Sequence, residues 1–244
     1  LLYTPMVKMK VTTQGEEVIN CLWDVIAAKG FEKDMYFEMA ARDIRALPKL
    51  EGTVHVNMAL IIKFMRNYFF MPGEFPEIGA ENEPRSDDFL FNQGATKGLG
   101  NIQFHDYNIA YDSVDLPNVN VFKEQIGILK LFLMTSAADA AAAKEQAKDI
   151  DFLLILGELF TLVAYGQGII EYRNLHPDDI SDDMLDQIFD FMVRDFTKFA
   201  IQLYSKPQST EAQMDLCLKM VRKPVVDAER YGRGISLSVR SLFD

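Results

Sequence analysis

Residues 16–53 read EEVINCLWDVIAAKGFEKDMYFEMAARDIRALPKLEGT, and this run opens with two helical patterns in succession. Its first part carries apolar residues at helical spacing: Val18, Ile19, Leu22 and Ile26. Gly30 ends that pattern, which predicts a helix over 16–29. A second helix is predicted over 34–46, because Pro48 then interrupts the periodicity.

The rest of the sequence predicts further helices, separated by one long irregular segment. A third helix is expected over 54–70. Residues 71–119 are rich in proline, glycine and asparagine and show no sustained period, so they are predicted to form a connector and a domain boundary. Beyond them, helices are expected over these ranges: 121–143, 149–174, 181–205 and 209–223.

The predicted fold class is therefore all-α, because no segment shows the alternation of a half-buried strand. Three parts are predicted. Residues 1–70 form a first set of helices, 71–119 form the irregular connector, and 120–244 form an additional C-terminal helical bundle.

The composition excludes some classes of partner. The chain has 244 residues and a formal net charge of −11, whereas binding to nucleic acid needs a basic face. The basic residues between 219 and 240 are interpreted as a solvated helix face paired with acidic residues elsewhere, with contact to phosphates or to a membrane surface as the alternative. The most apolar run, 152–164, contains Glu158 and is shorter than the roughly 20 residues of a membrane span, so no span is expected.

The cysteines and histidines give no sign of a disulfide or a metal site. Cys21 and Cys217 are far apart and outside any Cys/His cluster, which indicates a reducing compartment and predicts a cytoplasmic location. The three histidines lack partners at metal-ligand spacing. The chain starts at Leu1 without an initiator Met or a signal-peptide pattern, so a missing N-terminal part is expected.

The chemistry-bearing motifs lie within residues 24–53. Gly30-Phe31 closes the first helix, Arg42-Asp43 lies on the second, and Leu50-Glu51-Gly52-Thr53 follows eight residues later. In this order and spacing the segment resembles the signature of acyl-CoA dehydrogenases. The resemblance implies that residues 1–70 are the C-terminal part of the family's helical domain. Residues 71–119 and 120–244 resemble the irregular segment and the additional C-terminal helical domain of the very-long-chain type, in which the extra domain helps dimer formation and substrate accommodation.

The resemblance implies a flavoenzyme that dehydrogenates acyl-CoA thioesters between the α and β carbons. It implies that Glu51 is the base that takes the α-proton, and that FAD is the cofactor. Asp24, Ala27, Ala28 and Thr53 are the positions implied to contact the cofactor. The interpretation without catalysis is that Glu51 only begins a helix, where an acidic residue is favourable.

The segment also departs from the family pattern. The family usually has Gln-x-x-Gly-Gly near the flavin of a neighbouring subunit, where this chain has Asp24, Ala27 and Ala28. The departure favours an alternative function, a non-catalytic helical assembly module that has lost the flavin site.

Partners are implied by the same resemblance. They are acyl-CoA, an electron-transfer flavoprotein or similar acceptor, and a second copy of the chain in a homo-oligomer. The isolated chain is predicted to be inactive and not to retain FAD, since the remaining flavin contacts are expected from the missing part.

Overall fold

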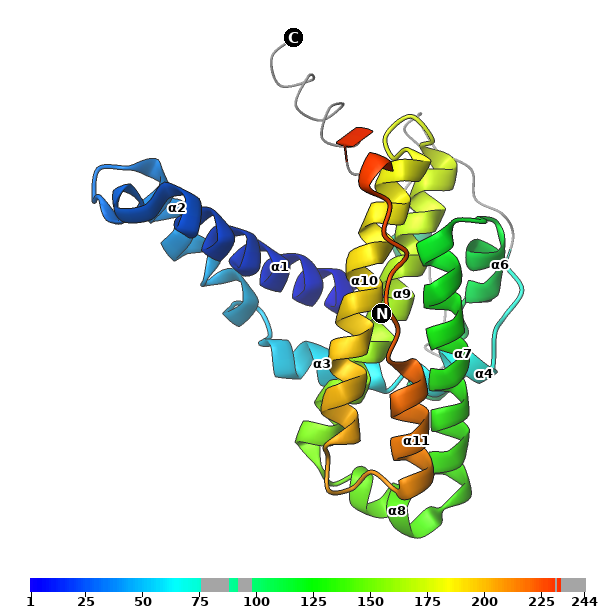
Figure 1. The fold of residues 1–244 in the computed structure, drawn as a ribbon. Helices are drawn as coiled ribbons and strands as arrows, with labels where there is room; N and C mark the ends of the chain where they lie inside the picture. Colours follow the sequence, from blue (N-terminus) through cyan, green and yellow to red (C-terminus); the bar gives the residue numbers. More distant parts are fainter. Residues whose placement is uncertain (76–87, 92–97, 231, 234–244) are drawn as a thin grey trace. The chain divides into compact units, whose positions relative to one another are not determined.

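The computed structural model describes residues 1–75, 88–91, 98–230 and 232–233. Within these residues it is all-helical, with a single isolated bridge between Gly73 and His105 and no strand (Figure 1). The predicted all-α class is confirmed. The chain divides into two compact units, Leu1–Lys63 and Phe64–Asp244, which are described separately.

The first unit is built on one long helix, α1 (Tyr3–Ile26). It is followed by the 3-10 turn η1 (Ala27–Phe31), α2 (Tyr36–Ile44), the 3-10 turn η2 (Leu47–Lys49) and α3 (Val54–Ile62). The segment after α2 returns antiparallel along α1. Its contacts move towards the N-terminus of α1 in three steps: Arg45 with Asn20, Lys49 with Glu16, and Gly52 with Lys8.

Helix α1 begins 13 residues earlier than the pattern predicted. The predicted start at residue 16 was wrong because Thr12 and Thr13 interrupt the apolar periodicity. In the structure their hydroxyls donate to the carbonyl oxygens of Lys8 and Met9, one turn back in the same helix. Met6 and Met9 are buried at 2% and 1% exposure, which supplies the packing for this early part.

The end of α1 is set by an aromatic cluster. Trp23 packs against Phe31 and Phe37, with ring centroids 4.8 and 5.6 Å apart. A Cβ at Gly30 would lie 2.6 Å from the Trp23 indole nitrogen, so glycine is required there by close approach. The helix itself ends at Ile26, three residues before the predicted end, because Ala27 has a positive φ of 54°.

The second unit is a helical bundle. It contains α4 (Met65–Phe70), α5 (Asp88–Phe91), the 3-10 turn η3 (Leu99–Asn101), α6 (Tyr107–Asp112), α7 (Pro117–Ala138), α8 (Ala140–Gln146), α9 (Ile150–Leu175), α10 (Asp182–Tyr204) and α11 (Glu211–Met220). Helix α10 contacts α7, α9 and α11, and α11 also contacts α7 (Figure 1). Aromatic rings fill the core, among them Tyr68, Tyr111, Phe122, Phe160, Phe189 and Phe196.

Polar side chains hold the extended segment after α11 onto this bundle. The buried Asn118 accepts from the Val225 N–H and donates to its carbonyl oxygen, at 2.7 and 3.2 Å. The Thr197 hydroxyl does the same for Arg222, at 3.0 and 2.9 Å. Each side chain thus satisfies both backbone groups of one residue, as a neighbouring strand would do.

Three predicted ranges are corrected by the structure. The predicted helix 54–70 is broken at residues 63 and 64, where the boundary between the two units falls. The predicted connector 71–119 is too long: Asp106 caps α6 and Pro117 starts α7, so helices begin before residue 121. The predicted helix 121–143 is interrupted at Asp139, whose carboxylate caps α8. Residues 76–87 and 92–97 of the connector lie outside the described residues.

Helix α9 is longer than the apolar run that the sequence singles out. Its 26 residues are long and apolar enough to cross a membrane, and its most apolar window is 67% buried inside the structure. A core helix of a soluble bundle has the same two properties, so the absence of a membrane span stays a prediction.

Candidate functional site

The turn that carries Glu51 has an unusual backbone. Glu51 has a φ of 50° and Gly52 a φ of 99°, so two consecutive residues lie on the positive side. Glycine adopts such a conformation freely, whereas a residue with a side chain is strained there. Strained residues of this kind are maintained where the surrounding structure holds them, and they cluster at functional sites.

Two side chains hold the backbone of this turn. The Lys8 Nζ of α1 donates to the carbonyl oxygens of Leu50 and Gly52. The buried Asn57 of α3 donates its Nδ2 to the Gly52 and Thr53 carbonyl oxygens, at 3.0 and 3.2 Å. Lys8 and Asn57 thus bind the backbone carbonyl groups of the turn, while the Glu51 side chain is exposed.

Thr53 precedes α3 as its N-cap, but its side chain makes no capping hydrogen bond. Both Thr53 and His55 are exposed. The turn therefore presents a carboxylate, a hydroxyl and an imidazole at the start of one helix. Carboxylates become stronger bases when they leave water, so proton abstraction by Glu51 requires a bound ligand or further protein to cover it.

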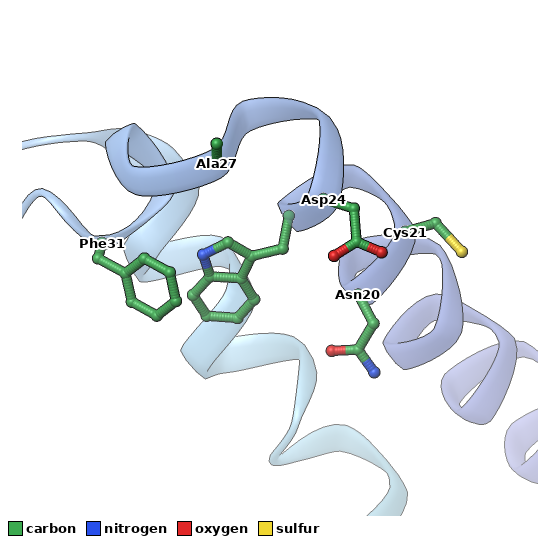
Figure 2. Close-up of a pocket in the computed structure, with 6 residues that line it drawn as sticks. Asn20, Cys21, Asp24, Ala27 and Phe31 are labelled. Carbon is green, nitrogen blue, oxygen red and sulfur yellow. The ribbon is translucent and has the colours of Figure 1, made fainter.

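A second candidate site lies at the other end of α1. An open cavity of about 600 Å³ is lined by Asn20, Cys21, Trp23, Asp24, Ala27 and Phe31 (Figure 2). Two of the four positions implied to contact the cofactor, Asp24 and Ala27, line it. Ala28 is exposed next to them.

The chemistry of this cavity is aromatic on one side and acidic on the other. The Trp23 ring packs against that of Phe31, with centroids 4.8 Å apart, and Asp24 is the next residue of α1. Figure 2 shows Phe31 and Asp24 among the residues that line the cavity. The Arg45 guanidinium lies 5.5 Å from the Trp23 ring centroid. The buried Trp23 indole nitrogen has no hydrogen-bond partner among the described residues. No cation is among the described residues that line the cavity, although Arg45 also donates to the lining residue Asn20, at 3.4 Å.

The two sites are far apart within the first unit. Asp24 and Lys8, which holds the Glu51 turn, are 16 positions apart on one continuous helix. At 1.5 Å rise per residue this is about 24 Å. The structure therefore does not bring Glu51 and Thr53 together with Asp24, Ala27 and Ala28.

The sequence missed Lys8 and Asn57 as the residues that hold the Glu51 turn. Lys8 lies 44 positions from Gly52, and no local pattern connects them. Asn57 could have been found from the local sequence. It lies five positions after Gly52 and four after Thr53, so its side chain reaches back about one helical turn to their carbonyl oxygens. As for metals, no group of three possible ligands occurs within the part of the chain that the structure describes.

Comparisons of this chain with protein-family models, with curated proteins and with solved structures found no match.

Proposed function

We propose that this chain forms the C-terminal helical part of an acyl-CoA dehydrogenase-like flavoenzyme, with Glu51 as the base that takes the α-proton. The observation that carries the proposal is the backbone at two motif positions. Glu51 and Gly52 form a positive-φ turn directly before α3, and Ala27 has a φ of 54° at a position where the resemblance puts a glycine. Both conformations favour glycine.

The proposed step at Glu51 is a proton transfer. The Glu51 carboxylate takes a proton from the carbon next to the thioester carbonyl, and a hydride leaves the β-carbon, so a double bond forms between the two. The electron balance requires an oxidant for that hydride, which is FAD in this proposal. The turn fits this role because Lys8 and Asn57 fix its backbone while the carboxylate stays accessible.

The residues around Asp24 do not fit the FAD pyrophosphate. Among the described residues, the lining of the cavity includes a carboxylate and no cation, and the alanine side chains limit close backbone approach. The proposal therefore assigns the phosphate contacts to parts of the protein outside these residues. In this proposal the chain itself positions the base, and its helices form contacts between subunits.

The alternative is a non-catalytic helical assembly module. The Asp24 carboxylate in the lining of this cavity favours it, because a negative charge there would repel the phosphates of a flavin cofactor. In this alternative the strained Glu51 turn is only the connection between η2 and α3.

An anaerobic titration of the full-length protein distinguishes the two functions. The purified protein is examined by visible absorption and then mixed with butyryl-, octanoyl- or palmitoyl-CoA. The enzyme proposal expects a bound flavin whose absorption is bleached by at least one of these thioesters. If the protein contains no flavin after purification and binds none when it is incubated with FAD, the assembly module is the function that remains.

A further inference from the structure

A small cavity in the second unit lies between α6 and α7. Its volume is about 230 Å³, and it is lined by Tyr107, Asn108, Tyr111, Lys123, Ile126, Gly127 and Lys130. Pockets for drug-sized ligands usually measure roughly 300–1,000 Å³. The space therefore suits a small molecule and is too small for CoA or a dinucleotide.

Gly127 keeps this cavity open. Lys123, Gly127 and Lys130 are spaced so that they share one face of α7. A Cβ at Gly127 would meet no atom within 4 Å, so no close neighbour requires a glycine there. Glycine inside a helix costs about 0.5–1 kcal/mol relative to alanine, and the structural consequence of this glycine is the open space.

Lys130 provides a cation at the cavity. Its Nζ lies 5.6 Å from the ring centroid of Tyr107 and 5.8 Å from that of Phe70. No carboxylate among the described residues lies within ion-pair distance of it. Lys123 differs, because its Nζ is paired with the Asp112 carboxylate at 2.6 Å. A half-buried ammonium that contacts only ring faces retains its capacity to donate to an anion.

The walls of the cavity are apolar. Tyr107, Tyr111 and Ile126 are 4%, 1% and 3% exposed. The Tyr111 hydroxyl donates to the Val163 carbonyl oxygen at 2.8 Å, so it is already used inside the bundle. Burial, with Asp106 nearby, raises the pKa of Tyr107 to about 12, which keeps this phenol neutral. Because Asp106 and Asp112 offset the two lysines, an anion would be recognised by contact with Lys130 rather than by a wide positive field.

We propose that this cavity binds a small carboxylate with a flat apolar body, whose charge meets Lys130 and whose body lies against Tyr107 and Ile126. The site lies in the second unit and is independent of any role of Glu51. It does not rest on the proposed enzyme activity.

Calorimetric titration of the whole chain with benzoate tests this site, with acetate and inorganic phosphate as comparison ligands. Benzoate is expected to bind saturably and more tightly than acetate, which lacks the flat body, and than phosphate, which lacks any apolar part. Lys130→Gln should weaken benzoate binding roughly tenfold or more, since a hydrogen bond to a charged group is lost. Lys198→Gln is the matched control, because Lys198 also lies over a ring, 5.4 Å from the Phe199 centroid, and does not line the cavity.

A second variant tests the space itself. Gly127→Leu fills the cavity and removes an interior glycine, so benzoate binding should be lost while the melting temperature is kept or raised. Gly168→Ala, at a glycine of α9 that also has free space around it, should bind benzoate normally. The proposal is overturned by a chain that does not bind benzoate, by full affinity in Gly127→Leu or Lys130→Gln, or by phosphate binding more tightly than benzoate.

Discussion

Lys8 and Gly52, 44 positions apart, are joined by a hydrogen bond from the lysine ammonium to the glycine carbonyl oxygen. The same ammonium donates to the Leu50 carbonyl oxygen, on the other side of Glu51. One side chain of α1 therefore holds both ends of the turn from which the Glu51 carboxylate projects. This is the contact that connects the long first helix to the candidate catalytic residue.

Removal of the Lys8 ammonium should loosen this turn. Lys8→Gln is expected to lower the stability of the first unit by about 1–2 kcal/mol, because two carbonyl groups lose a charged donor. Trp23 is the one tryptophan of the chain, so the unfolding of this unit is followed by its fluorescence. Lys29→Gln, at an exposed lysine after α1, is the control and should change stability little. Equal stability of the two variants would contradict the role given to Lys8.

The positive φ of Glu51 predicts opposite effects of two substitutions. Glu51→Gly should keep or raise the stability of the first unit, since glycine adopts this conformation without strain. Glu51→Val should lower it by about 1–2 kcal/mol, because a β-branched side chain is strained at positive φ. Denaturation followed by Trp23 fluorescence measures both. A valine variant as stable as the glycine variant would show that the turn is not strained.

Removal of Arg230, which pairs with Asp186, should lower stability far more than removal of Arg233. The side chains of Arg230 and Asp186 are 5% and 3% exposed, and Asp190 lies 3.8 Å from the same guanidinium. Arg230→Met leaves the buried Asp186 carboxylate without its cation, whereas Asp190 keeps Arg194 at 2.7 Å, and the substitution should cost about 3–5 kcal/mol. Arg233→Met removes the exposed ion pairs with Asp183, Asp227 and Glu229 and should change stability little. Urea denaturation followed by circular dichroism compares them, and similar losses would count against the buried network.

The two cysteines should differ in reactivity and in their effect at high pH. Cys21 is exposed and Cys217 is buried, and burial raises the pKa of Cys217 to about 12 from an ordinary value of 9.0. A thiol reagent at neutral pH should modify Cys21 alone in the folded chain. The Cys217 thiol loses its proton near pH 9 in the unfolded chain and only near pH 12 in the folded chain. Its contribution to stability is therefore present below pH 9 and is lost as the pH rises towards 12. A Cys217→Ala variant should lack that part of the alkaline loss. Rapid modification of both thiols would contradict the burial of Cys217.

Helix ends with local capping signals could be predicted from the sequence. Ser181 was expected to start a helix, and its side chain accepts from the Met184 N–H at the start of α10. Thr210 lies in the segment expected to open the last helix, and it forms a capping box with Gln213 at the start of α11. Both capping interactions join residues within four positions of each other, so they form in the folded chain independently of distant segments.

Features that depend on distant parts of the chain could not be predicted. Asn118 holds Val225 from 107 positions away, and Thr197 holds Arg222 from 25. The break at residues 63 and 64 falls inside a continuous apolar pattern. The helix is broken there because Phe64 belongs to the core of the second unit. The sequence placed Glu51 between the predicted helices 34–46 and 54–70, but it could not show the positive φ or the exposure of its carboxylate, which depend on Lys8 and Asn57.

The rate of flavin reduction in the Glu51→Gln variant of the full-length protein tests the central claim most directly. Glutamine keeps the size of the side chain and removes the basic carboxylate. With a thioester that bleaches the flavin of the parent protein, the variant should be reduced about 10²–10⁴-fold more slowly, with a smaller change in binding. Glu38→Gln, on α2 where Glu38 pairs with Arg42 at 3.5 Å, is the control and should react at the parental rate. Reduction of Glu51→Gln at the parental rate would show that the base lies elsewhere.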